Sequence, residues 1–241
     1  MTMTERYFKI LVDGKSCHGG DSVWSLPDGD KPGDWMPKLT KLVPCEHGYH
    51  IVMAHQIPWW MKNNCQIFEV ETSGKVINDS DKFVCGKVRL VKHMQFDPEI
   101  TPRLFAADCV EHVLHYYEDK YPGDDRPRKS IEAGRKYARK QITREEMESF
   151  WSAAWDAIQD VAGDDWVVQD VARAAAWAAT PEAAGAAAWE SFWAAAWDAV
   201  RAANMDTALA AAWVSTRDAA WEAEQDWQGQ QLLKYLDGEL S

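Results

Sequence analysis

The chain has 241 residues, 46% of them apolar, so it is long enough and apolar enough to bury a core and is not expected to be disordered. Its net charge of −12 is unevenly placed, because residues 145–241 carry 18 acidic against 4 basic side chains, a balance of −14. Such an end repels phosphates, which argues against double-stranded nucleic acid and favours a basic protein partner or simple solubility.

The sequence indicates a soluble cytoplasmic protein. No run of about 20 uncharged apolar residues is present, so no membrane-spanning helix and no membrane partner are expected. Residues 1–6 lack the basic segment and apolar run of a signal peptide. The five cysteines are odd in number and scattered, which is typical of reduced thiols.

The first hundred residues read as short strands and turns, which predicts a small mixed sheet domain over residues 1–98. Asp13-Gly14 and Ser73-Gly74 are turn pairs, and residues 66–71 alternate apolar and polar side chains as a half-buried strand does. Strands are expected at residues 7–12, 22–26, 41–43, 49–53, 66–71 and 87–91, with a short helix at 57–63.

The rest of the chain predicts an antiparallel helical bundle over residues 99–241, rich in Ala and Trp, so the fold class is α+β. Thr101 and Pro102 read as an N-cap and a first helical position, and Thr143 with Glu146 reads as a capping box. Further helices are expected to begin near residues 124–127, after 163–165, at 180–181 and at 206, and the last to end near 237–238.

The helical part contains an unusual pattern of Trp and Ala. Ten of the fourteen tryptophans follow residue 150, often at i, i+4 spacing that places them on one helix face. We expect Trp and Ala to interdigitate as a core, with an aromatic slot for a flat ligand as the alternative. Residues 148–157 recur as 190–199, which indicates a duplicated helical hairpin or chance similarity in a biased composition.

A glycine-containing polar loop at residues 16–20 is the leading candidate for a pocket wall. Glycine lets the backbone approach a ligand closely, and the aromatic side chains and histidine that follow could complete the pocket. The alternative is a tight turn with local hydrogen bonds. The candidate binding residues here are Ser16, His18, Gly19, Trp24, Trp35 and His50.

Cys45, His47 and His50 carry atoms that zinc prefers, but their spacing is not that of a standard zinc site. We therefore expect no metal and no cofactor. Whether these three residues ever bind a metal stays open.

Basic residues gather between positions 126 and 144. They are expected to be solvated or paired with acidic helices, and a phosphate or acidic-protein site is the alternative. An anionic ligand is expected to bind to the positive charge of Arg103, Arg126 and Arg128.

Standard catalytic signatures are missing from the sequence, including the nucleophile elbow, the phosphate-binding loop and the helical zinc motif. Cys17 and His18 could act as a nucleophile and a base, but neighbours on a strand point in different directions. The sequence therefore favours binding over catalysis.

Two resemblances follow from these motifs. Residues 5–95, with the pattern 14–20, Trp24, Trp35, 44–45 and 48–50, resemble an uncharacterised domain of phage and bacterial proteins. Residues 100–235, with the patterns 103–109 and 125–133, resemble immunity proteins of bacterial toxin systems. The second resemblance implies a small protein that binds and neutralises a target, such as a host defence protein when a phage encodes it.

The resulting hypothesis is a non-enzymatic inhibitor of the immunity or phage anti-defence type, with a protein partner. The alternatives are a sponge for a small anionic nucleotide signal, an enzyme that uses the loop at residues 16–20, and a platform for homo-oligomerisation.

Overall fold

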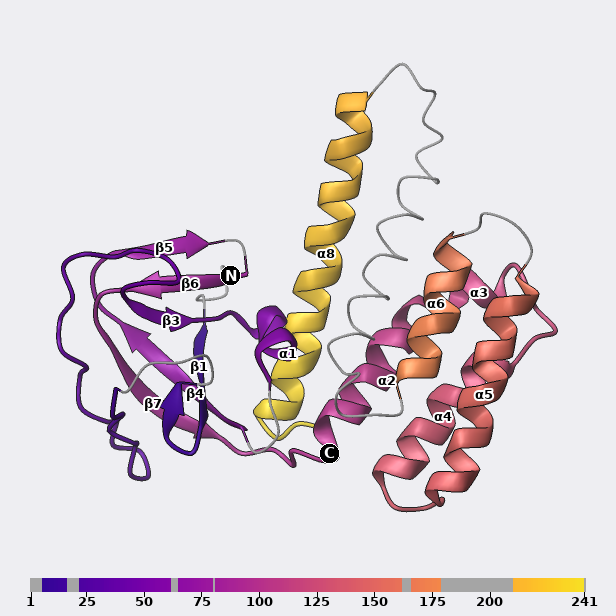
Figure 1. Cartoon of the computed structure of the whole chain (residues 1–241), viewed down its shortest axis with the longest axis horizontal. Coiled ribbons are helices and arrows are strands. Elements are labelled where there is room, and N and C mark those ends of the chain that lie inside the picture. Colours follow the sequence, from indigo (N-terminus) through magenta and orange to yellow (C-terminus); the bar gives the residue numbers. More distant parts are fainter. Residues whose placement is uncertain are drawn as a thin grey trace. The chain divides into compact units, whose positions relative to one another are not determined.

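The computed structural model describes residues 6–16, 22–61, 65–79, 81–161, 166–178 and 210–240. The chain divides into two compact units (Figure 1). The first comprises Met1–Pro98 together with Leu232–Leu240, and the second comprises Glu99–Gln231 with Ser241. Antiparallel sheets form the first unit and helices dominate the second, so the predicted α+β class is confirmed.

Two antiparallel sheets build the first unit. Strands β1 (Tyr7–Val12), β2 (Lys15–Ser16), β4 (Cys65–Thr72) and β7 (Val88–Met94) form one sheet in the order β2-β1-β4-β7. Strands β3 (Tyr49–Ile51), β5 (Val76–Asp79) and β6 (Lys82–Cys85) form the other in the order β3-β6-β5. Phe8 and Val52 join the two, because they exchange backbone hydrogen bonds of 2.8 and 2.9 Å.

The turn between β1 and β2 follows directly from its sequence. Asp13 and Gly14 have φ angles of 51° and 73°, the left-handed pair that an Asp-Gly hairpin turn requires. β1 pairs with β4 in register from Tyr7 opposite Val70 to Val12 opposite Cys65. The buried side chains of these strands include Leu11 and Phe68, which pack with Trp24 and Leu90 in the unit's core.

Some predicted strands are wrong. Residues 22–26 and 41–43 are loop, and Val43 makes only an isolated bridge to His47. The loop runs beside β7, where the backbone N–H groups of Gly33 and Met36 donate to the carbonyls of Leu90 and Val88. Hydrogen bonds to β7 thus hold the loop between the two predicted segments, and neither segment forms a strand.

A helical turn connects β3 to the segment before β4. It consists of a 3₁₀ segment (Ala54–Gln56) followed by helix α1 (Ile57–Trp60), with Pro58 in the first turn. The predicted helix at 57–63 is therefore present but shorter within the described residues.

The second unit contains α2 (Thr101–Val113), α3 (His115–Glu118), α4 (Arg126–Ala138), α5 (Arg144–Asp160), α6 (Trp166–Trp177) and most of α8 (Ala210–Leu236). The capping box predicted at Thr143 is confirmed, because its hydroxyl accepts from the Glu146 N–H at 3.2 Å and its N–H donates to the Glu146 carboxylate at 2.8 Å. The N-cap predicted at Thr101 is wrong: Ile100 holds that position, and Thr101 is a buried first-turn residue.

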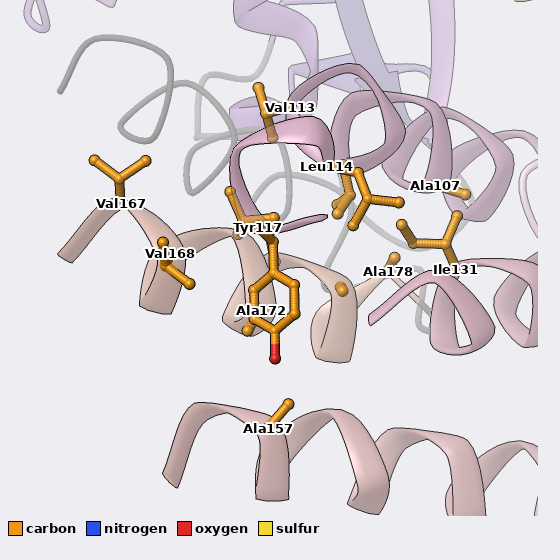
Figure 2. Packing of buried hydrophobic residues seen from close by; sticks show 14 of the residues in the cluster. Ala107, Val113, Leu114, Tyr117, Ile131, Ala157, Val167, Val168, Ala172 and Ala178 are labelled. Carbon is orange, nitrogen blue, oxygen red and sulfur yellow. The ribbon is translucent and has the colours of Figure 1, made fainter. Parts of the chain in front are cut away.

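Small side chains fill the described core of the second unit. Ala157 of α5 and Ala172 of α6 are fully buried, as are several valines and alanines of α2 and α6 (Figure 2). α5 packs against α4 and α6, and α2 packs against α4. Methyl-sized side chains allow such helices to approach closely.

Five tryptophans of this unit have a described side chain, and none of the five belongs to the buried core cluster, so the Trp–Ala core expected from the sequence is not found at these positions. Trp151 is 43% exposed and Trp177 is 42% exposed, while Trp155, Trp221 and Trp227 are half-buried. Alanine occupies the tight helix contacts and Trp lies at their margins. Trp189, Trp193 and Trp197 lie outside the described residues, as do the repeat at 190–199 and the helix starts expected at 180–181 and 206.

The C-terminal end of the chain belongs to the first unit. Arg6 forms two hydrogen bonds to the Asp237 carboxylate, at 2.7 and 3.1 Å, and also bonds to Glu69 of β4. Leu232 and Leu236 are buried. No described helix is both long and apolar enough to cross a membrane.

Candidate functional site

A cavity of about 420 Å³ lies in the first unit. Its walls include Ser16 at the end of β2, Trp24 of the long loop and His50 of β3, three residues that the sequence analysis placed in one pocket. Lys9 of β1 and Lys82 of β6 also line it. The sheets thus bring residues far apart in sequence around one space.

Lys9 is a buried cation at this cavity. It is only 6% exposed, its ammonium donates to the His50 carbonyl at 3.0 Å, and it lies 5.1 Å from the centroid of the Trp24 ring. Trp24 packs edge-on against Tyr49, whose hydroxyl donates to the Pro37 carbonyl at 2.8 Å. An ammonium at the face of an indole is a favourable arrangement that leaves the positive charge near the cavity.

Lys82 supplies a second buried cation. Its ammonium lies 2.7 Å from the Asp81 carboxylate and 3.2 Å from that of Asp79, and 5.5 Å from the Trp60 ring centroid. The hydrogen bond to Asp81 is the main reason that the pKa of Lys82 is raised, so this side chain stays charged. The indole N–H of Trp60 donates to the Asp81 carbonyl at 3.1 Å, which fixes the ring beside the lysine.

The pKa of His50 is lowered, which favours its neutral form. Burial lowers its pKa, and the charges of Lys9 and Lys82 lower it further. Its Nε2 accepts a hydrogen bond of 3.0 Å from the Cys45 backbone N–H. His47 instead contacts the Lys41 carbonyl through Nδ1. Among the described residues, no three histidine, cysteine or acidic side chains gather as metal ligands.

One residue of the expected pocket, Trp35, lies elsewhere in the first unit. Trp35 does not line the cavity. Its ring instead contacts Lys87 and Arg89, each 4.7 Å from the ring centroid. His18 and Gly19 lie outside the described residues, and so does Cys17, the expected partner of His18 in a catalytic pair.

The arginines expected to bind an anion are engaged with groups of the protein. Arg126 bonds to Asp124 and, at 2.7 Å, to Asp160. Arg103 donates to the Glu99 carbonyl at 3.0 Å and lies 5.0 Å from the Tyr137 ring centroid.

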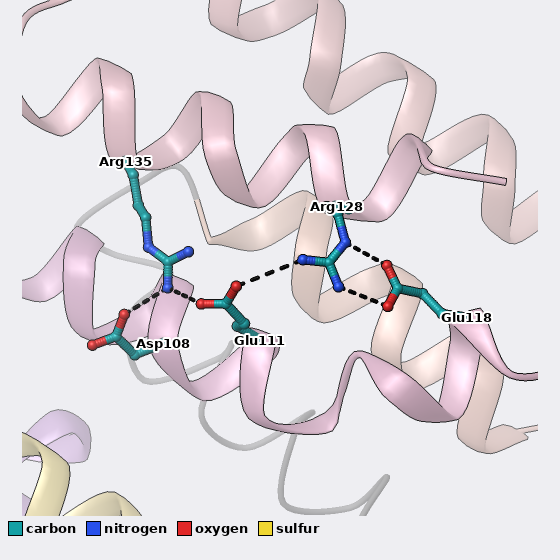
Figure 3. A network of polar contacts seen from close by, with 5 residues as sticks. All are labelled: Asp108, Glu111, Glu118, Arg128 and Arg135. Carbon is teal, nitrogen blue, oxygen red and sulfur yellow. Dashed lines mark hydrogen bonds and ion pairs between the residues drawn. The ribbon is translucent and has the colours of Figure 1, made fainter. Parts of the chain in front are cut away.

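Arg128 belongs to a longer chain of ion pairs. It bonds to Glu118 and approaches Glu111 at 3.7 Å, and Glu111 also pairs with Arg135, which in turn bonds to Asp108 (Figure 3). These ion pairs connect α2 and α3 to α4. Their role in the structure is to hold helices together.

A second polar group of this unit consists of residues far apart in the sequence. His112 lies 2.9 Å from the Glu224 carboxylate and stacks on Trp227, with ring centroids 3.8 Å apart. Glu224 is only 3% exposed and also accepts from Gln228. The sequence gives no local signal for this cluster, because Glu224 and Trp227 are more than a hundred positions away from His112.

The exposed side of α5 is an acidic surface of the second unit, although two of its carboxylates, Glu148 and Asp160, pair with Arg144 and Arg126. The helix carries Glu145, Glu146, Glu148, Asp156 and Asp160, all exposed, against the single cation Arg144. Trp151 is also exposed on this helix and packs edge-on against Trp155, with ring centroids 6.0 Å apart. An exposed aromatic ring on an acidic helix is typical of a surface that binds a protein.

Comparison with known proteins identifies the helical part. A family model described as Imm-5 like putative immunity protein matches residues 93–235, more than half of the chain. No curated protein and no solved structure matches the chain. The matched region contains all of α2 to α6 and the α8 residues up to Tyr235. The chain therefore belongs to the family of Imm-5 like putative immunity proteins.

Proposed function

We propose that this chain is a non-enzymatic immunity-type protein that neutralises a protein toxin by binding it through the exposed side of α5. Family membership supports the neutralising role and the protein partner. One observation supports the choice of surface: within the matched region, α5 carries both the exposed Trp151 and five exposed carboxylates.

Both the charge of this part of the chain and its exposed tryptophan favour binding to a protein. Residues 145–241 carry 18 acidic and 4 basic side chains, so they attract a basic surface and speed its approach. Once the surfaces meet, an exposed tryptophan can anchor the complex, because tryptophan is enriched among residues that dominate binding energy. We therefore expect a toxin with a basic patch surrounding a pocket for the indole.

Binding rather than turnover fits the polar groups of the helical unit. Arg126, Arg128 and Arg135 each bond to carboxylates from other parts of the same unit. Groups held in this way stabilise the helix arrangement and are poorly placed to react. The toxin is expected to leave the complex chemically unchanged.

A capture experiment tests the proposal. The full chain, immobilised, is exposed to extract of cells that encode it, in parallel with Trp151→Ala and Trp177→Ala. Trp177 is an ideal control because it is as exposed as Trp151 but lies on α6. We expect one basic protein on the wild type and on Trp177→Ala, with binding at least about tenfold weaker to Trp151→Ala.

Two further readouts make the test specific. Raising the salt concentration from about 50 to 300 mM should weaken the complex several-fold, because the attraction is between exposed charges. The captured protein should inhibit growth when expressed alone. A partner that binds all three proteins equally, or that is harmless to cells, would contradict the proposal.

A further inference from the structure

The cavity of the first unit has no part in toxin binding through α5, yet it has the composition of a ligand site. Its volume of about 420 Å³ falls within the range of roughly 300–1,000 Å³ that is usual for small-molecule pockets. We propose that it binds a small molecule consisting of a flat ring with an attached anionic group. Lys9 would contact the anion, and Trp24 or Trp60 would contact the ring.

The anionic group is inferred from the polar side chains of the wall. Lys9, Ser16 and Ser22 line the cavity with hydrogen-bond donors, and Glu46 is the carboxylate among the lining residues. Lys82 also lines it, but its ammonium is paired with Asp79 and Asp81 and adds no net positive charge. Lys9 is only 6% exposed, so the interaction of its charge with an anion is less screened than at a surface. A ligand with acceptor oxygens therefore matches this wall better than a cation does.

The flat ring is inferred from the aromatic part of the wall. Trp24, Tyr49 and Trp60 line the cavity together with aliphatic side chains of β1 and β3. Each lysine lies against an indole, 5.1 Å from Trp24 and 5.5 Å from Trp60. This arrangement places a stacking surface directly beside a positive charge, so one molecule can use both.

Adenosine 5′-monophosphate is the probe, because it combines a flat base with an anionic group. Its binding to the full chain is followed by calorimetry and by tryptophan emission. Adenosine provides the ring without the charge, and inorganic phosphate provides the charge without the ring. We expect saturable binding of one probe molecule per chain, and at least about tenfold weaker binding of either part alone.

Variants connect the binding to this cavity. Lys9→Met should weaken binding at least about tenfold. Lys87→Met is the matched control, because Lys87 also lies over an indole, that of Trp35, but does not line the cavity. We expect this control to bind within about twofold of the wild type. Should Lys9→Met fail to fold, Trp60→Leu decides, since Trp60 is only half-buried and lies on the short helix α1.

Several results would overturn the inference. One is no saturable response to the nucleotide up to about 5 mM. Another is adenosine or phosphate binding as tightly as the whole nucleotide. A third is binding that neither Lys9→Met nor Trp60→Leu weakens. None of these results bears on toxin binding by α5, which is measured with a different partner and different variants.

Discussion

Asp124 is the residue whose charge contributes most clearly to stability. It accepts from the Arg126 guanidinium at 2.8 Å and from the Tyr117 hydroxyl at 2.6 Å. The hydrogen bonds to Arg126 are the main reason that its pKa is lowered to about 2. Asp124→Asn should therefore lower the free energy of unfolding by about 1–2 kcal/mol at pH 7.

The stabilisation by Asp124 depends on pH, because the pKa of its carboxyl is lowered in the folded protein. A carboxylate with a lowered pKa in the folded state stabilises the fold above its unfolded pKa of about 3.9. The difference between wild type and Asp124→Asn, measured by urea unfolding, should thus shrink as the pH falls from about 4 to about 2. Asp125→Asn is the control, because that side chain is 60% exposed and pairs only with Lys129 among the contacts seen. Equal effects of the two variants, or a difference that does not change with pH, would refute this role.

Only some of the residues that line the cavity could be predicted from the sequence. Ser16, Trp24 and His50 stood out because glycine-flanked polar loops and aromatic residues often form pockets. Lys9 and Lys82 did not stand out, because a lysine within a strand normally points to solvent. Their burial depends on how two sheets meet, which is a long-range property of the fold.

Among the elements, α5 owes its start to a local device. Thr143 and Glu146 satisfy each other's backbone N–H groups at the N-terminus of the helix. Thr143→Ala should lower the free energy of unfolding by about 1 kcal/mol. Ser152→Ala, at an exposed position within the same helix, should be neutral or slightly stabilising, because Ala favours helices. Thermal unfolding of the two variants checks this, and an equal loss in both would exclude a capping role.

The contact between α5 and its neighbours depends on alanine. Ala157 is fully buried in the core cluster of the second unit. Ala157→Leu should lower the free energy of unfolding by about 1–3 kcal/mol, because the added atoms would force close helices apart. Ala219→Leu is the control, since Ala219 is exposed on α8 and Leu is also a good helix former. A stable Ala157→Leu protein would mean that these helices pack more loosely than the structure shows.

Elements with strong local signals were predictable from sequence. The Asp-Gly turn, the alternating strand β4 and the capping box of α5 each depend on a few adjacent residues. Strands β5 and β6 were missed, because they are four residues long and owe their pairing to each other and to β3. The Trp–Ala pattern predicted helices correctly, but apolar character alone does not say which of the two residues fits a close helix contact.

For the whole molecule, charge and chain path matter more than any single element. The sequence shows the acidic C-terminal part, and the structure places five of its 18 acidic residues on α5. The sequence does not show that Leu232–Leu240 joins the sheet unit, because the pairing of Arg6 with Asp237 links residues 231 positions apart. Such pairings follow from the complete fold and not from local pattern.

The central claim is that this protein neutralises a toxin by binding it through α5. The most direct measurement is growth of cells that express the captured toxin together with wild type, Trp151→Ala or Trp177→Ala, each at equal protein level. We predict that wild type and Trp177→Ala restore growth and that Trp151→Ala does not, although it folds normally because its indole is exposed. Full protection by Trp151→Ala, or no protection by the wild type, would contradict the account.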